Sequence, residues 1–159
     1  MAGLKFIYAM ELPVHGGSLR VLLKHEGTET SLPDEAYTTE DFRSRVLHHK
    51  INIQSSIAHI KETGSTIAGF GAAAKAATLI NYCGIADYID YIVDETEWKQ
   101  GKYLSGTSIP IVGMGHLAAN PPDYLWIFPW NFADQIKSRL KPVYDGDFIT
   151  TRNGEVQCR

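Results

Sequence analysis

The sequence predicts an α/β fold in which helices flank a parallel β-sheet, and three features indicate it. Strand-like apolar runs alternate with segments of helical spacing from residue 39 onward. The strand-like run Ser65–Ala68 leads into Gly69-x-Gly71 and then into a helix-forming stretch. Tyr124–Phe128 is apolar throughout, which is typical of a central strand that is covered on both faces. This alternation predicts parallel strands joined by right-handed crossovers.

Composition favours one domain with an appendage and a sizeable hydrophobic core. The chain has 159 residues, 44% of them hydrophobic, and a formal net charge of −3. Its Lys and Arg residues are scattered, which argues against nucleic acid and anionic membranes as partners. Cys83 and Cys158 are too few for a disulfide framework or a zinc site, and no apolar run approaches the roughly 20 residues of a membrane span. With no signal-peptide pattern at its start, we expect a cytoplasmic protein without a bound metal.

The first 30 residues predict a β-hairpin that needs a further partner, either the rest of this chain or a partner outside it. Leu4–Met10 and Ser18–Lys24 are strand-like, and the glycine-containing segment Pro13–Gly17 joins them. Since an isolated hairpin is marginally stable in water, we expect it to pack against something else. Residues 26–37 are polar and contain Gly and Pro, so we expect a linker there.

A long helix follows the linker, and α/β units follow the helix. Thr38 or Thr39 caps this helix, its apolar residues keep helical spacing, and Gly64 ends it. The elements expected after the first strand are a helix over 72–83 capped by Gly84, a strand ending at residue 94, a short strand at 109–111, the strand at 124–128, a helix over 132–140 and a last strand at 148–151.

The turn at Gly69-x-Gly71 carries the strongest functional signal in the chain. Both glycines allow positive φ and close approach of the backbone. Ala72 and Ala73 come next, in the first turn of the expected helix, where unpaired amides and the helix dipole favour a phosphate. Lys75 adds a positive charge to the same anion, or is a solvated helix lysine. Because the third small residue of the motif is Ala instead of Gly, a closely packed turn without a ligand is the alternative.

Asp94 and Asn131 follow two other predicted strands, and each has two interpretations. Asp94 lies about 20 residues after the glycine turn, where a dinucleotide fold places its ribose-binding carboxylate. It also opens a polar loop and therefore suits a turn start. Asn131 would hydrogen-bond a ligand on which Trp130 stacks, or else it caps a helix while Trp130 packs in the core. We expect Trp98 and the nearby Tyr103 to anchor their loop.

Several segments, taken together, resemble the S-adenosylmethionine-dependent sugar C-methyltransferases, which act on nucleotide-linked deoxysugars. His15–Arg20 is similar to a segment near the end of their methyltransferase domain. The segments similar to their Rossmann-like C-terminal domain are Gly69–Lys75, Leu79–Gly84, Asp94, Lys99–Gly101, Gly106 with Ile109–Ile111, and Pro129–Asn131. The resemblance covers nearly the whole chain. It implies a Rossmann-like domain over residues 31–159, preceded at 1–30 by a hairpin from the end of a methyltransferase domain.

The resemblance also implies that this chain holds the substrate and not the methyl donor. The family's zinc-binding segment, its S-adenosylmethionine glycine loop and its catalytic cluster have no counterpart in this sequence. We therefore expect no catalytic residue and no cofactor on this chain, with S-adenosylmethionine bound elsewhere in the full-length enzyme. The expected partners are a dTDP-type nucleotide-sugar, the missing methyltransferase domain and, across the face that this domain would leave uncovered, a second copy in a homodimer.

Two residues of the hairpin complete the predicted site. Ser18 and Arg20 alternate on one face of their strand, and Arg20 would bind a phosphate through two parallel hydrogen bonds or form a surface ion pair. The predicted substrate-binding residues are Ser18, Arg20, Gly69, Gly71, Ala72, Ala73, Lys75, Asp94 and Asn131. Two other functions stay open: an independent NAD- or nucleotide-binding domain that uses Asp94 on a ribose, and a scaffold that only docks the methyltransferase half.

Overall fold

The computed structural model describes residues 3–12, 18–25, 27, 39–152 and 155–158. The chain divides into two compact units, Met1–Arg45 and Val46–Arg159. The domain boundary expected after residue 30 stays a prediction. Among the described residues, no helix combines the length and the apolar character that crossing a bilayer requires.

The first unit contains the predicted antiparallel hairpin, with strands β1 (Leu4–Leu12) and β2 (Ser18–His25). The turn at 13–17 and nearly all of the linker at 26–37 lie outside the described residues. The two strands form a sheet of their own. Several large apolar side chains of the hairpin are exposed, namely Leu4, Phe6, Leu19, Val21, Leu22 and Leu23.

Helix α1 (Thr39–Glu62) contributes its residues from Val46 onward to the other unit. Ile53, Ile57 and Ile60 recur at helical spacing and are buried in the core of that unit. The helix ends where Gly64 adopts a φ of +79°, a left-handed conformation that glycine takes without strain.

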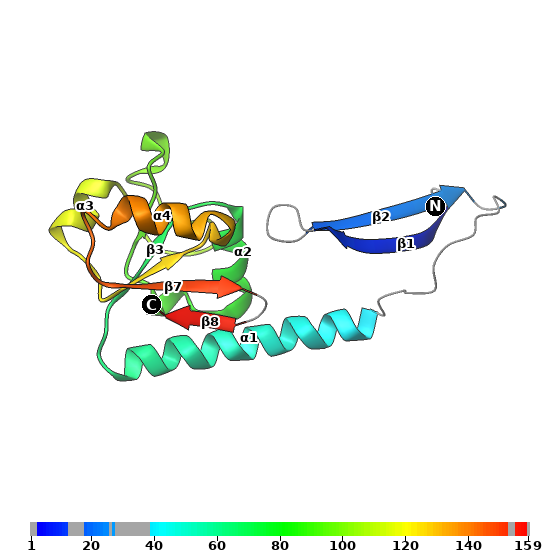
Figure 1. Ribbon diagram of the computed structural model, residues 1–159, viewed down its shortest axis with the longest axis horizontal. Coiled ribbons are helices and arrows are strands. Elements are labelled where there is room, and N and C mark those ends of the chain that lie inside the picture. The colour runs from blue at the N-terminus through cyan, green and yellow to red at the C-terminus, as the bar shows by residue number, and fades with distance from the viewer. Residues whose placement is uncertain (1–2, 13–17, 26, 28–38, 153–154, 159) are drawn as a thin grey trace. The chain divides into compact units, whose positions relative to one another are not determined.

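The second unit is built on a six-stranded sheet with the strand order β5-β4-β3-β6-β7-β8 (Figure 1). Five strands are parallel: β3 (Ile67–Phe70), β4 (Ile92–Val93), β5 (Ile111–Val112), β6 (Tyr124–Ile127) and β7 (Asp147–Arg152). The prediction of a parallel sheet is wrong at one edge, because β8 (Glu155–Cys158) pairs with β7 in antiparallel orientation. The connection to β8 is too short for the crossover that a parallel pair requires.

Helices cover both faces of this sheet, so the fold is α/β with a mixed sheet. Side chains of α1 and α2 (Ala74–Cys83) pack with one face, and those of α3 (Met114–Ala119) and α4 (Ala133–Leu140) pack with the other (Figure 1). In β6, Trp126 belongs to the first core cluster, while Leu125 belongs to the second. Both are fully buried, which confirms the prediction of a central strand.

The strand order reverses between β3 and β6, and this reversal defines the edge where a ligand is expected. From β3 the chain adds β4 and then β5 on one side, and afterwards returns to form β6 on the other side of β3. In open α/β sheets, ligands bind outside the carboxyl ends of the strands at such a point. The residues that follow β3, β4 and β6 are therefore the first place to look for a site.

Candidate functional site

The turn after β3 packs its backbone directly against the end of β6. Gly71 has a φ of +92°, which L side chains rarely adopt, and a Cβ there would lie 2.8 Å from Pro129 Cγ. A Cβ on Gly69 would lie 2.6 Å from Phe128 Cε2. Close packing therefore explains both glycines, whether or not a ligand approaches the turn.

Helix α2 begins two residues later than expected, and its first turn is accessible. Ala73 is the N-cap residue and supplies no side-chain cap, and both Ala73 and Ala74 are exposed. The amide of Ala72 donates to Asp94 Oδ2 at 2.8 Å, and that of Ala73 donates to Gly71 O at 2.9 Å. These two predicted phosphate donors are thus used within the protein. The amides of residues 74–76 are the ones that an α-helix leaves without intrahelical partners, since the Ala77 amide donates to Ala73 O.

The buried carboxylate of Asp94 connects the end of β4 to the glycine turn. Asp94 is 6% exposed, and its Oδ2 accepts hydrogen bonds from the Ala72 amide at 2.8 Å and from Lys99 Nζ at 3.0 Å. Its Oδ1 accepts from the Thr96 amide at 2.9 Å, so Asp94 does start a turn. Three donors occupy most of the roughly four acceptor positions of a carboxylate. A ribose contact of Asp94 stays a prediction.

Lys99 completes this connection with its charge. Its Nζ also donates to Ala72 O at 2.9 Å, so it bonds both the carboxylate and the backbone of the turn. Burial alone raises the pKa of Asp94, but the hydrogen bonds from Thr96 and the hydrogen bond and charge of Lys99 outweigh burial and lower that pKa. The side chains of Lys99 and Asp94 are 24% and 8% exposed, so water screens the pair only in part.

A second cluster lies at the end of β6 and contains Lys75, Trp130 and Asn131. Lys75 Nζ donates to Asn131 Oδ1 at 2.9 Å and lies 4.3 Å from the centroid of the Trp130 ring. Trp130 and Asn131 begin the 3-10 helix η3 (Trp130–Phe132), and the N-cap position of α4 belongs to Phe132. Since an ammonium group has three donors, Lys75 retains donors for an anion.

Six of the nine predicted residues lie at this edge of the sheet, after β3, β4 and β6: Gly71, Ala72, Ala73, Lys75, Asp94 and Asn131. Gly69 lies within β3 and serves its packing. Ser18 and Arg20 lie in β2 of the first unit, where Ser18 is half-buried and Arg20 is exposed. A role of Ser18 and Arg20 in the same site stays a prediction.

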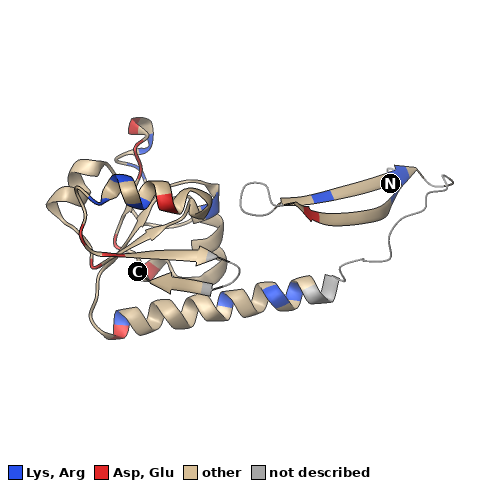
Figure 2. Ribbon diagram, viewed as in Figure 1, with Lys and Arg blue, Asp and Glu red and all other residues tan. Residues whose placement is uncertain are grey.

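The loop after β4 differs from the sequence-based expectation. Trp98 and Tyr103 are 70% and 66% exposed, so the expectation that they anchor the loop is wrong. Lys99 is one residue that does anchor it, through hydrogen bonds to Asp94 and to the glycine turn. A lysine five positions after a strand-ending acid is a weak signal, because only the fold of the loop brings the two charges together. Lys and Arg otherwise occur over several elements and are interspersed with acids (Figure 2).

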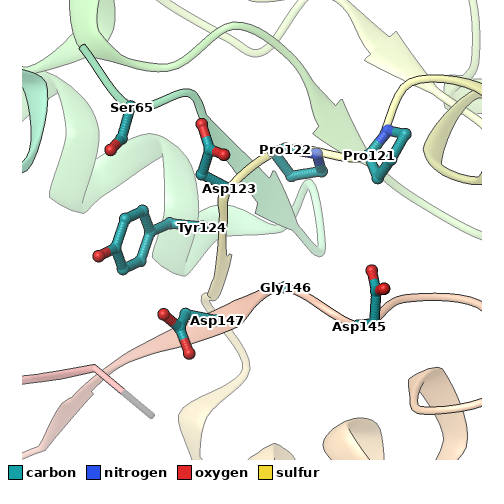
Figure 3. Close-up of a pocket in the computed structure, with 8 residues that line it drawn as sticks. All are labelled: Ser65, Pro121, Pro122, Asp123, Tyr124, Asp145, Gly146 and Asp147. Carbon is teal, nitrogen blue, oxygen red and sulfur yellow. The ribbon is translucent and has the colours of Figure 1, made fainter. Parts of the chain in front are cut away.

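A cavity of about 480 Å³ opens near the start of β6 and β7, and its lining is acidic (Figure 3). It is lined by Ser65, Pro121, Pro122, Asp123, Tyr124, Asp145, Gly146 and Asp147. Asp123 Oδ2 accepts from the amide and the hydroxyl of Thr66, both at 2.7 Å, and these bonds lower the pKa of Asp123. In the part of the chain that the structure describes, no three His, Cys, Asp or Glu side chains are placed to hold a metal ion. An acidic cavity repels phosphates, so an anionic ligand favours the edge with the glycine turn.

Comparison with known proteins identifies the family. Residues 13–151 match the family model described as the C-methyltransferase C-terminal domain. The match covers most of the chain, so the chain belongs to this family, as the sequence resemblance indicates. One relative, C-methyltransferase NovU from Streptomyces niveus, is 29% identical over 92% of this chain and 39% of its own length. The chain therefore spans about two fifths of that curated relative.

Proposed function

We propose that this chain is the nucleotide-sugar-binding, Rossmann-like C-terminal domain of an S-adenosylmethionine-dependent sugar C-methyltransferase. Membership of the C-terminal domain family supports the enzyme class. The contact of Lys75 with Asn131 and Trp130 supports the ligand class most directly. Lys75 lies in the first turn of α2, at the edge where the strand order reverses. A cation and a helix N-terminus at such an edge together suit a diphosphate.

In this proposal the chain binds and orients the substrate, and the chemistry takes place on groups outside it. Diphosphate oxygens would accept hydrogen bonds from Lys75 Nζ and from the first free amides of α2. Fixing the sugar in one orientation lowers the entropic barrier to methyl transfer. When bound to the enzyme, S-adenosylmethionine supplies the methyl group.

The glycine turn of this chain fits S-adenosylmethionine or NAD poorly. Both ligands carry a ribose whose hydroxyl groups call for an acid with free acceptor positions, and the acid that ends β4 is Asp94. Its carboxylate already accepts hydrogen bonds from Ala72, Thr96 and Lys99. The methyl donor is therefore assigned to the rest of the enzyme, and a dinucleotide is the weaker candidate.

A scaffold function has one observation in its favour, since close packing already explains Gly69 and Gly71. Calorimetry of the 159-residue chain separates the candidates, with dTDP, NAD and S-adenosylmethionine as parallel titrants. We expect saturable heat with dTDP only. Heat with NAD alone would favour the dinucleotide domain, and the absence of heat with all three would favour the scaffold.

A cytosolic location and a homodimer stay predictions.

Lys75 provides the matched test of the site. We expect Lys75→Met to weaken dTDP binding by about 5- to 150-fold, which corresponds to roughly 1–3 kcal/mol for a lost charged hydrogen bond. Lys141→Met removes the same charge from an exposed position after α4 and should leave the dissociation constant unchanged. Equal dTDP affinity of the Lys75→Met variant and the wild-type chain would remove Lys75 from the site.

A further inference from the structure

The loop after β4 presents a tryptophan to solvent at the same edge of the sheet. Trp98 lies in the 3-10 helix η2 (Glu97–Lys99) and is 70% exposed, the highest value among the large apolar side chains of the described residues. Tryptophan is usually well buried, because its ring is the largest apolar group of any side chain. The exposure of the Trp98 side chain therefore calls for an explanation.

The loop that carries Trp98 is held in place from both sides. Gln100 Nε2 donates to Asp94 O at 2.9 Å, and the Gly101 amide donates to Ile111 O at 2.9 Å. These bonds join the loop to the end of β4 and to the start of β5. A ligand that stacks on Trp98 would meet a support that is already ordered, so binding would lose little conformational entropy.

Lys99 connects the Trp98 ring to the glycine turn. Lys99 Nζ lies 5.9 Å from the centroid of the Trp98 ring and 2.9 Å from Ala72 O. Lys102 Nζ lies 5.2 Å from the same centroid. Two cations therefore lie within about 6 Å of the ring centroid, and one of them, Lys99, contacts the turn that leads into α2.

The surroundings of Trp98 favour a small anionic ligand over a protein surface. Protein interfaces are depleted of Lys and Glu at their cores, whereas Trp98 is flanked by Glu97, Lys99 and Lys102. The other tryptophan at this edge, Trp130, already has Lys75 Nζ 4.3 Å from its ring centroid. Trp130 is half-buried whereas Trp98 is 70% exposed, so Trp98 offers the more open ring for stacking.

We infer that Trp98 stacks on the base of a nucleoside diphosphate whose phosphates bind at Lys75 and the start of α2. This inference rests on the proposed function and adds to it a residue that recognises the nucleoside. Bases stack on aromatic side chains with substantial affinity and little sequence preference. The two lysines close to the ring would add favourable charge for a ligand that carries phosphates.

Calorimetric titration of the full 159-residue chain with dTDP and with inorganic pyrophosphate tests the inference. We expect Trp98→Ala to weaken dTDP binding about 10-fold or more and to leave pyrophosphate binding unchanged, because only dTDP carries a base. Trp98→Phe should restore most of the affinity for dTDP. Tyr103→Ala removes another aromatic of similar exposure, 66%, and should change neither dissociation constant.

The outcomes separate this inference from the proposed function. If wild-type chain binds dTDP and Trp98→Ala binds it equally well, the stacking role is overturned and the proposed function stands. Equal losses of dTDP and pyrophosphate affinity in Trp98→Ala would also overturn stacking, because a general effect on the loop would then be responsible. If the wild-type chain binds neither titrant, the proposed function fails and the inference fails with it.

Discussion

Replacing Asp94 by Asn is expected to destabilise the second unit by about 3 kcal/mol. An Asn side chain has one carbonyl oxygen, so its amide nitrogen must face either the Thr96 amide or the pair formed by the Ala72 amide and Lys99. At least one buried donor then loses its acceptor, which costs about 1–3 kcal/mol. In either orientation the ion pair with Lys99 is lost, and the Asp94 side chain is only 8% exposed, so water screens that pair little. For a chain of this size, about 3 kcal/mol lowers the Tm by roughly 6–12 °C.

The same carboxylate makes stability depend on pH at the acid end. Because the pKa of Asp94 lies below its ordinary 3.8 in the folded chain, the unfolded chain binds more protons between those two values. The contribution of Asp94 is therefore complete above about pH 4 and is lost as the pH falls through the folded pKa. The Asp94→Asn variant lacks this titration. Its stability difference from wild type should shrink as the pH falls below about 4.

Urea unfolding followed by circular dichroism at neutral pH, and again at acidic pH, measures both effects. Asp87→Asn is the matched control, because Asp87 is an exposed residue of the 3-10 helix η1 (Ala86–Tyr88) and loses the same charge. We expect this control to stay within about 0.5 kcal/mol of wild type. If Asp94→Asn unfolds with the wild-type free energy at neutral pH, the carboxylate does not hold the glycine turn and our reading of the loop is refuted.

Two further predictions concern packing and thiol access. Gly69→Ala would place a Cβ 2.6 Å from Phe128 Cε2 and should lower the free energy of unfolding by about 1–3 kcal/mol in urea titrations, whereas a wild-type value would show that β6 can move away. Burial raises the pKa of both thiols, but Cys83 is 0% exposed whereas Cys158 is exposed. A thiol reagent at mildly alkaline pH should therefore label Cys158 first and Cys83 only on unfolding, and rapid labelling of Cys83 would contradict its burial.

The elements predicted well from sequence are those whose composition reflects their burial. The run over 124–128 is apolar throughout because β6 is a central strand whose side chains are covered on both faces of the sheet. The strand expected up to residue 94 shrinks to Ile92–Val93, because the chain after α2 first forms the 3-10 helix Ala86–Tyr88. The β-rich composition of residues 88–94 gives no sign of this local turn.

Two elements were missed because tertiary contacts produce them. Helix α3 contains a glycine and lacks a side-chain cap, so its propensity is low, yet Leu117 is fully buried in the second core cluster. Strand β8 is short, and it exists through its pairing with β7. The local sequence pattern indicates neither the packing of α3 nor the pairing of β8 with β7.

Parts of the candidate site were recognisable from sequence, and others needed the fold. The glycine turn and Lys75 follow from the strand-turn-helix motif. The commitment of the Asp94 carboxylate to Ala72 and Lys99 depends on how the loop after β4 folds back, which no spacing rule encodes. The exposure of Trp98 contradicts the average behaviour of tryptophan and therefore could not be predicted from residue type.

Amide chemical shifts of the ¹⁵N-labelled chain during a dTDP titration test the proposed binding function most directly. We expect saturable shifts at Ala74 and Lys75, together with the side-chain amide of Asn131, and little change around the acidic cavity at Asp123. Unchanged shifts at the start of α2, or shifts confined to the cavity, would contradict it.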